Sequence, residues 1–321
     1  MQAVWIDTDM GFDDLAAVLT VAARPDWQID GLSLVAGNAP LDVVVDNALR
    51  SAACFGLRMP IHAGCDRPLA CELVTAQSIL GADAMASAGR SLPQARAPLA
   101  EGHAVQALKD YLSAPARKAA TVLALGPLTN IAALLLAYPE MAGQIGTLVW
   151  MGGSAGPGNH TAAAEFNAAV DPEAVQVVLD HGVPLRMVGL DACRQVRVHA
   201  QDAQALRGLG TPRAELLADM LLGYVRIAKP DGSLPMSLYD PTAAAALVAP
   251  EGMQWRVGHL VMECKGEHTR GMTVIEWRVP RRAQANSQVA SLADESLLRS
   301  VVLHGLHHAA RLPDATQEKL P

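Results

Sequence analysis

The sequence predicts an α/β fold built on a mostly parallel open sheet with helices on both faces. Short apolar runs recur along the first two thirds of the chain, and most of them end in a turn that contains Gly or Asn. Segments with helical spacing separate these runs, and several open with capping residues. Strands that alternate with helices form parallel sheets with right-handed crossovers. The chain shows no linker-like composition and no internal repeat, so residues 1–321 are expected to form one domain.

The first elements follow this alternation. An apolar run at residues 4–6 predicts a strand, and residues 15–19 begin a helix. Residues 31–37 predict a second strand, residues 41–55 a helix, and residues 60–64 a short strand. Residues 67–98 are rich in Gly, Ala, Ser and Pro and have weak periodicity, which predicts a surface excursion that could act as a flap.

The alternation then resumes and changes near the end. Helices are expected at residues 103–112, 127–138 and 212–228, and strands at 121–125, 148–151 and 184–190. Further helices are expected to start at Asp171 and Asp240, each of which precedes a Pro at the first helical position. Strands at residues 255–264 and 272–278 predict a small C-terminal strand pair. A strand at 287–292 precedes the terminal helix, and residues 311–321 are expected to be a loosely ordered tail.

Composition excludes several classes of protein. With 321 residues, 51% of them hydrophobic, the chain can bury a large core. A net charge of -7 argues against a nucleic-acid surface. The five scattered cysteines form no Cys-x-x-Cys pair, and neither a signal peptide nor a stretch of transmembrane length is evident. A cytoplasmic protein without nucleic-acid or membrane partners is therefore expected.

Four carboxylates stand close together where the first strand meets the first helix. Asp7, Asp9, Asp13 and Asp14 fall within eight positions, and ligands of open α/β sheets bind at such strand ends. Their mutual repulsion requires a cation or bound protons, which favours a hard divalent metal. An EF-hand loop is excluded because Val18 occupies the position of the required Glu. The Asp-x-Asp motif of a dehalogenase-type phosphatase would account for Asp7 and Asp9 but not for Asp13 and Asp14. Capping of the following helix would account for only one of the four acids.

The acidic cluster and six later segments together resemble the inosine/uridine-preferring nucleoside hydrolases. The later segments follow in the family's order between residues 37 and 273, and the match spans roughly residues 4–273. They are Gly37-Asn38, Leu125-Gly-Pro-Leu-Thr-Asn-Ile-Ala132, Met151-Gly152-Gly153, Gly158-Asn159, Glu165-Phe166-Asn167 with Asp171-Pro-Glu173, and Asp240-Pro241 with Thr269-Arg-Gly-Met-Thr273. The resemblance implies the nucleoside hydrolase fold with a Rossmann-like core.

The resemblance also implies a function and a set of site residues. It implies a Ca²⁺-dependent N-ribosyl hydrolase that uses a metal-activated water to cleave a ribonucleoside into ribose and a free base, in nucleoside catabolism and purine or pyrimidine salvage. Relatives are commonly dimers or tetramers, so a homo-oligomer is expected. The implied calcium ligands are Asp9, Asp14, Asp240 and the Leu125 carbonyl, with Asp7 behind them and Asp9 also the general base. The implied ribose contacts are Asp13, Asn38, Met151, Asn159, Glu165 and Asn167.

The chain departs from the family where the leaving base is handled. Many relatives carry a His before the last metal-binding Asp and a second His in the flap, and these positions here are Tyr239 and Leu80. Tyr239 is a candidate leaving-group donor, although a phenol is a weaker acid than an imidazolium. Tyr224 could face the base, and His160 follows one of the sugar-binding segments. The base preference therefore stays open.

Three alternatives to the hydrolase stay open on the sequence alone. A non-catalytic relative, or one of altered specificity, would bind ribosides without turning over common nucleosides. A dehalogenase-type phosphatase would release phosphate, and a plain α/β scaffold protein would bind no metal.

Overall fold

Side chains on the central strands alternate between two cores, one on each side of the sheet. On β1 (Gln2–Thr8), Val4 and Ile6 pack in one core while Trp5 packs in the other. β5 (Ile145–Met151) behaves in the same way, with Val149 in the first core and Trp150 in the second. Burial of both faces explains why the strands read as continuous apolar runs in the sequence. The structure is a computed structural model that describes residues 1–117, 119–278 and 284–312.

The described residues form a nine-stranded sheet and a separate two-stranded ladder. The order in the large sheet is β3-β2-β1-β4-β5-β6-β11-β9-β10, and the pairs from β3 to β11 are parallel. β9 pairs antiparallel with β11 and with β10. The remaining strands are β2 (Trp27–Leu34), β3 (Ile61–Ala63), β4 (Ala120–Ala124), β6 (Leu185–Val188), β7 (Arg197–Val198), β8 (Met236–Ser237), β9 (Met253–Met262), β10 (Thr273–Glu276) and β11 (Ser287–Ala293).

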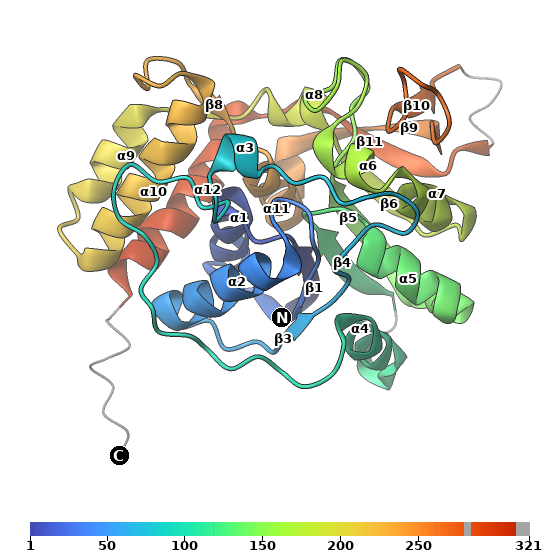
Figure 1. The fold of residues 1–321 in the computed structure, drawn as a ribbon, viewed down its shortest axis with the longest axis horizontal. Helices are drawn as coiled ribbons and strands as arrows, with labels where there is room; N and C mark the ends of the chain where they lie inside the picture. The colour runs from blue at the N-terminus through green and yellow to red at the C-terminus, as the bar shows by residue number, and fades with distance from the viewer. Residues whose placement is uncertain (118, 279–283, 313–321) are drawn as a thin grey trace.

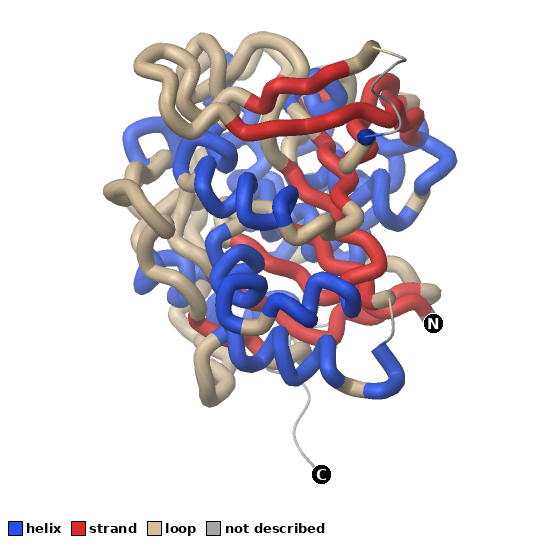
Figure 2. Tube along the Cα trace, turned by 90° about the vertical axis from the view of Figure 1, so that its right-hand side faces the viewer, coloured by secondary structure: helices blue, strands red, loops and turns tan. Residues whose placement is uncertain are grey.

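Helices cover both faces of the sheet, as Figures 1 and 2 show. One face carries α1, α2 and α8 to α12, and the other carries α4, α5 and α7. The helices are α1 (Phe12–Ala22), α2 (Leu41–Phe55), α3 (Gln77–Leu80), α4 (Ala104–Ser113), α5 (Thr129–Ala137), α6 (Phe166–Val170), α7 (Pro172–Asp180), α8 (Leu190–Cys193), α9 (Ala200–Arg207), α10 (Pro212–Ala228), α11 (Asp240–Val248) and α12 (Glu295–Arg311).

The predicted fold class is confirmed, with differences at its margins. The C-terminal strand pair β9 and β10 extends the main sheet through β11. The short helices α3 and α8 were not predicted, since four residues are too few to show a helical period. α12 continues to Arg311, and residues 313–321 of the expected tail lie outside the described residues.

The predicted flap, residues 67–98, crosses the carboxyl edge of the sheet and carries α3 (Figure 1). Backbone hydrogen bonds tie it to the body at several points. The N–H of Ala76 donates to the Asn38 oxygen (3.1 Å), and the N–H of Ala88 donates to the Asp219 oxygen on α10 (2.8 Å). These ties hold α3 above the strand ends where the acidic cluster lies.

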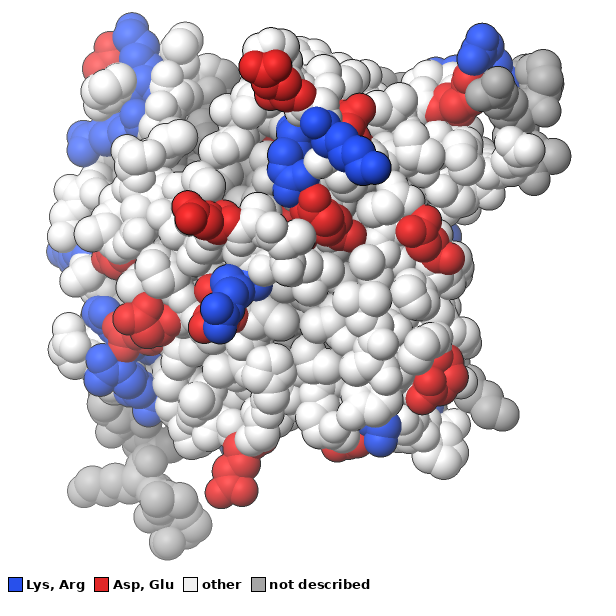
Figure 3. All heavy atoms as spheres, turned by 45° about the vertical axis from the view of Figure 1, so that its right-hand side comes forward, with Lys and Arg blue, Asp and Glu red and all other residues white. Residues whose placement is uncertain are grey.

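Acidic and basic side chains are interspersed on the face drawn in Figure 3. The ion pair between Arg270 and Glu173 is bidentate: Nη1 and Nη2 of Arg270 each donate to one carboxylate oxygen of Glu173 at 2.7 Å. Within the described residues, no helix is both long and apolar enough to cross a membrane.

Candidate active site

The site lies where the strand order reverses, between β1 and β4. The chain passes from β1 outward through β2 and β3 and then returns to the other side of β1 as β4. Thr8 ends β1, Leu125 follows β4, and Met151 ends β5, so these residues share the carboxyl edge of the sheet. Ligands of open α/β sheets bind at such a switch point.

Asp14 is held by donors from three parts of the chain. The Thr8 hydroxyl donates to its Oδ1 (2.5 Å), while the Gly11 N–H (2.8 Å) and the Asn38 Nδ2 (3.1 Å) donate to its Oδ2. The side chain is fully buried in the first turn of α1. Burial raises the pKa of Asp14, and the hydrogen bonds oppose that rise. The carboxylate is therefore fixed in position before any ligand arrives.

Three carboxylates form a group that could hold a metal ion. Ligand oxygens of Asp13, Asp14 and Asp240 lie within 4.8 Å of one another. Asp9 lies against this group: its Oδ2 accepts the Asn38 N–H (2.7 Å), and its buried Oδ1 has no hydrogen-bond partner among the described residues.

Burial and mutual repulsion raise the pKa values of these carboxylic acids. Burial, followed by the charge of Asp14, raises the pKa of Asp9 and of Asp240 well above the usual range. The same two causes raise the pKa of Asp13 to about 7. An orphaned buried oxygen beside crowded carboxylates fits a bound cation, which would supply both the missing partner and the missing charge.

Asp7 lies deeper and does not line the cavity. Its Oδ1 accepts hydrogen bonds from the Ser33 hydroxyl and from Asn130 Nδ2 (2.8 Å), and its Oδ2 is buried without a partner. Burial raises the pKa of Asp7 to about 7, against the lowering effect of these two hydrogen bonds. A place for Asp7 behind the metal ligands therefore stays a prediction.

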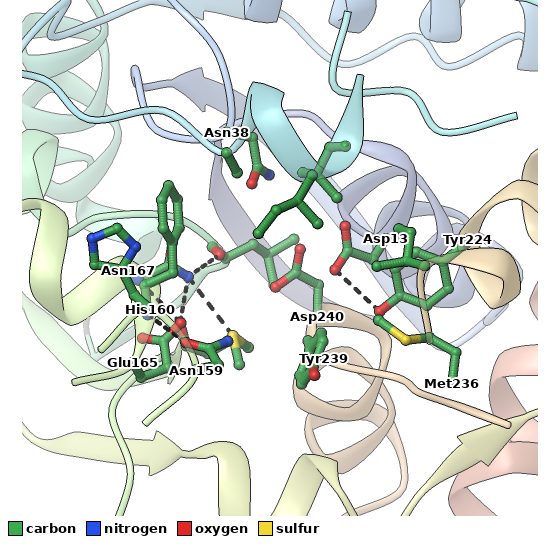
Figure 4. A pocket seen from close by; sticks show the side chains of 17 residues that line it. Asp13, Asn38, Asn159, His160, Glu165, Asn167, Tyr224, Met236, Tyr239 and Asp240 are labelled. Carbon is green, nitrogen blue, oxygen red and sulfur yellow. Dashed lines mark hydrogen bonds between the residues drawn. The ribbon is translucent and has the colours of Figure 1, made fainter. Parts of the chain in front are cut away.

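A cavity of about 250 Å³ opens above the acids (Figure 4). Asp7, Asp9 and Asp14 are buried and do not line it, whereas Asp240, Leu125 and all the expected ribose residues do. Tyr239, Tyr224, Leu80 and His160, singled out for the leaving base, line it as well. The lining is Asp13, Asn38, Ala76, Ile79, Leu80, Leu125, Met151, Asn159, His160, Glu165, Phe166, Asn167, Tyr224, Ile227, Met236, Tyr239 and Asp240.

The polar wall of the cavity is built from the segment around α6. Asn167 Nδ2 donates to the carbonyl oxygens of Leu125 (2.8 Å) and Met151 (3.0 Å), which joins the ends of β4 and β5. The Asn159 Oδ1 accepts the Phe166 N–H (3.0 Å). Each amide thus uses one end for the fold, and the other end, Asn167 Oδ1 or Asn159 Nδ2, can serve a ligand.

Glu165 has a structural task that the sequence did not reveal. It is the N-cap of α6, and its carboxylate accepts the backbone N–H groups of Gly153 (2.8 Å), Asn167 (3.0 Å) and Ala168 (3.1 Å). Burial raises the pKa of Glu165 to about 7, and the hydrogen bonds oppose that rise. Any ligand contact by this carboxylate adds to its capping role.

The opposite wall is more apolar and includes residues that sequence reasoning missed. Ile227 and Met236 line the cavity without having been predicted. Ile227 lies three residues after Tyr224 on α10, so the helical period could have placed both on one face. Met236 lies beyond that helix on the two-residue strand β8, where no periodic pattern exists.

The two tyrosines differ in their surroundings. The Tyr224 hydroxyl donates to the Ser237 carbonyl (2.8 Å) and lies 3.4 Å from Oδ2 of Asp13. Tyr239, the residue before α11, is half-buried, and burial is the main reason that its pKa rises to about 12. A phenol with that pKa can donate a hydrogen bond but is a poor proton donor near neutral pH.

Comparison with known proteins gives consistent results. Residues 4–299 match the family model described as inosine-uridine preferring nucleoside hydrolase. Pyrimidine-specific ribonucleoside hydrolases RihA from Salmonella typhimurium and Citrobacter koseri are each 33% identical to the chain, over 85% of it and 88% of their own length. A purine-preferring ribonucleoside hydrolase from Gardnerella vaginalis superposes with a TM-score of 0.88 at 25% identity, covering 97% of this chain and 99% of that one. A plant nucleoside hydrolase superposes with a TM-score of 0.84 at 26% identity, covering 95% and 99%.

Proposed function

The chain belongs to the inosine-uridine preferring nucleoside hydrolase family and hydrolyses the N-glycosidic bond of ribonucleosides, and we propose that it does so with a Ca²⁺ ion held by the acidic cluster. The observation that carries this proposal is the orphaned Oδ1 of Asp9 beside Asp13, Asp14 and Asp240. Membership of the family also favours the hydrolase over the phosphatase and scaffold alternatives.

The proposed ion would be held by oxygen ligands only. Asp9, Asp14 and Asp240 would supply carboxylates and Leu125 its carbonyl, with Asp7 behind them. Calcium prefers such ligands and tolerates irregular geometry. When bound, the ion lowers the pKa of a water molecule and binds sugar hydroxyls. Oδ1 of Asp9, which is buried and has no partner in the protein, is the proposed acceptor for a proton of the attacking water.

The ribose would lie between the acids and the polar wall. Asp13, Asn38, Asn159, Glu165 and Asn167 are proposed to bind its hydroxyls, with Met151 beneath the ring. All six line the cavity. Cleavage of the N-glycosidic bond develops positive charge on the sugar, and nearby carboxylates stabilise that charge. The residues that orient the sugar thus also favour the transition state.

The base would face the apolar wall. Leu80 and Tyr239 line the cavity at the two positions where many relatives carry His. The Tyr239 hydroxyl is proposed to donate a hydrogen bond to the base. The chain is similar both to relatives named for pyrimidine specificity and to one named for purine preference. The test below therefore uses nucleosides with both kinds of base.

The cellular setting follows from the same proposal. Cys65, Cys71, Cys193 and Cys264 are free thiols, in keeping with a reducing cytoplasm, where the enzyme would serve nucleoside catabolism and salvage. A homo-oligomer is proposed by analogy with the family, and light scattering on the purified protein would measure its state.

Ribose release across a panel of purine and pyrimidine ribonucleosides tests the proposal. Protein stripped with EDTA is expected to be inactive, and Ca²⁺ is expected to restore turnover more fully than Mg²⁺. Asp9→Ala should abolish turnover, and its circular dichroism should match that of the wild type. Absence of ribose release from every nucleoside after calcium reloading would refute the function, and full activity of Asp9→Ala would remove Asp9 as the base.

A further inference from the structure

Asn159 lies on a loop, residues 154–164, that two charged side chains of the α8 segment hold in place. The loop follows β5 and lies beside α8 (Figure 1). Asn159 lines the cavity, and Figure 4 shows it on the side away from Tyr224. Its Oδ1 accepts the Phe166 N–H (3.0 Å), so its Nδ2 is the group that can bind a ribose hydroxyl. The position of this amide therefore depends on the path of the loop.

Asp191, in α8, binds the start of the loop. Its Oδ2 accepts the N–H of Ala155 (2.5 Å) and lies 3.2 Å from the Ser154 hydroxyl oxygen. That hydroxyl oxygen accepts the N–H of Gly156 (3.1 Å), and a Cβ at Gly156 would lie 3.0 Å from Asp191 Oδ1. The carboxylate thus lies against three successive residues of the loop.

Arg194, the residue that follows α8, binds the next two residues of the loop. Its Nη1 donates to the Pro157 carbonyl (3.0 Å) and its Nη2 donates to the Gly158 carbonyl (2.9 Å). A planar guanidinium that holds two successive carbonyls fixes their relative orientation, whereas an ammonium group offers no such fork. These two hydrogen bonds are made directly before Asn159 in the chain.

The α8 segment is itself anchored, so it offers a fixed support. Gln195 Oε1 accepts the Ala293 N–H (3.0 Å) on β11, and its Nε2 donates to the Ser291 carbonyl (3.2 Å) on the same strand. At the other end of α8, the N–H of Leu190 donates to the Gly153 carbonyl (3.0 Å). Arg194 and Asp191 therefore connect the loop to the main sheet.

The far end of the loop closes in a tight turn. The N–H groups of Asn159 (3.2 Å) and His160 (3.1 Å) both donate to the Ala164 carbonyl. The turn requires glycine at position 158, because a Cβ there would lie 2.2 Å from the Ala164 oxygen. Asn159 thus has the Arg194 hydrogen bonds directly before it and the turn directly after it.

We propose that Arg194 is a positioning residue that holds the Asn159 amide against the ribose. The assignment rests on the proposed function, in which Asn159 binds a ribose hydroxyl. Arg194 is not among the residues that line the cavity, so it acts through the loop and not on the substrate. Without the guanidinium, the carbonyls of Pro157 and Gly158 lose their shared donor and the loop can shift. A displacement of about 1 Å in a binding group can lower the rate by about 10²-fold.

A double-mutant cycle tests the assignment. We would measure kcat and KM on the best nucleoside of the panel for the wild type, Arg194→Met, Asn159→Ala and the double variant. We expect Arg194→Met to lower kcat/KM by about 10-fold or more, and the double variant to lose at most about twofold beyond Asn159→Ala. Arg197→Met is the matched control and should behave as the wild type, because Arg197 is exposed and pairs with Glu295 (3.1 Å).

Deoxy analogues give a second readout that a merely structural role would not move. The 2′-, 3′- and 5′-deoxy forms of the nucleoside are measured as competitive inhibitors. Asn159→Ala should raise Ki least for the form that lacks the hydroxyl bound by Asn159. Arg194→Met should show the same pattern across the three forms.

Arg194→Lys separates the paired hydrogen bonds from the positive charge. The ammonium keeps the charge but lacks the fork, so we expect a loss of kcat/KM between those of the wild type and Arg194→Met. This variant also supplies the cycle if circular dichroism shows that Arg194→Met does not fold.

Other outcomes overturn the assignment in distinguishable ways. Additive losses in the double variant, or a wild-type kcat/KM for Arg194→Met, would show that Arg194 does not act through Asn159. Equal increases in Ki for all three deoxy forms would make Arg194 a general support of the fold. Full activity of Arg194→Lys would assign the effect to charge alone, and full activity of Asn159→Ala would remove the contact to be positioned. If the wild-type protein releases ribose from no nucleoside, the proposed function has failed instead.

Discussion

Replacing Asp240 by Asn is expected to stabilise the metal-free protein and to remove its stabilisation by Ca²⁺. The ligand oxygens of Asp13, Asp14 and Asp240 lie within 4.8 Å of one another. Two unit charges at 4.8 Å repel by about 3 kcal/mol at an effective dielectric constant of about 20. Bound protons already relieve part of this repulsion, so we expect Asp240→Asn to gain about 1 to 2 kcal/mol. For 321 residues this gain corresponds to a rise of about 2 to 3 °C in Tm.

In the presence of Ca²⁺ the substitution should have the opposite effect, because the wild type gains stability from the ion and the variant gains little. A ligand present at about 100 times its Kd stabilises the folded state by about 2.7 kcal/mol. For a chain of this size, that energy raises Tm by about 4 °C. Asp240→Asn should lose most of this shift because it removes one proposed ligand charge.

Thermal unfolding after EDTA treatment, with and without added CaCl₂, measures both effects. Asp110→Asn, on the exposed side of α4, is the matched control and should show the wild-type calcium shift. A lower Tm for metal-free Asp240→Asn, or a calcium shift as large as that of the wild type, would refute the inference that Asp240 belongs to a repulsive, cation-binding cluster.

Two further substitutions probe residues that support the site from outside the cavity. Asn130→Ala removes buried hydrogen bonds to Asp7 Oδ1 (2.8 Å), the Leu34 carbonyl (3.0 Å) and the Cys65 N–H (2.8 Å), and we expect it to cost about 3 kcal/mol or more by denaturant unfolding. Gly223→Ala places a Cβ 2.4 Å from the Ser87 backbone, so the flap should be displaced from α10 and KM should rise, although Ala favours the helix by about 1 kcal/mol. A wild-type KM and Tm for Gly223→Ala would show that the flap tolerates the displacement.

The order of helices and strands was readable from the sequence because the strands are buried on both faces. Continuous apolar runs such as that in β4 and β5 signal such strands, and turns punctuate them. The order of the strands within the sheet was not readable. Insertion of β11 between β6 and β9 pairs Ser287 with Leu185, about 100 positions earlier in the chain, and with Gly258, about 30 positions earlier.

The site residues also fall into two groups, those that a local sequence pattern predicts and those that only the fold brings into the site. Asp7 to Asp14 could be assigned to a strand end because they are contiguous and too acidic to stand without compensation. Asp240 joined them only through the family resemblance, because no local pattern links it to β1. Met236 and Ile227 were missed because an apolar cavity wall has the same composition as a core.

Asp7 shows why the surroundings of a predicted site residue cannot be read from the sequence. Its Oδ1 partners, Ser33 on β2 and Asn130 on α5, lie 26 and 123 residues away. Asn130 reads as an ordinary helix residue in the sequence, yet its amide joins the ends of β1, β2 and the segment after β3. Burying a carboxylate without such donors costs free energy of folding. The acids of the site are therefore stabilised by neutral polar residues as well as by the proposed cation. These polar residues carry no charge pattern and no periodicity, so only the fold reveals them.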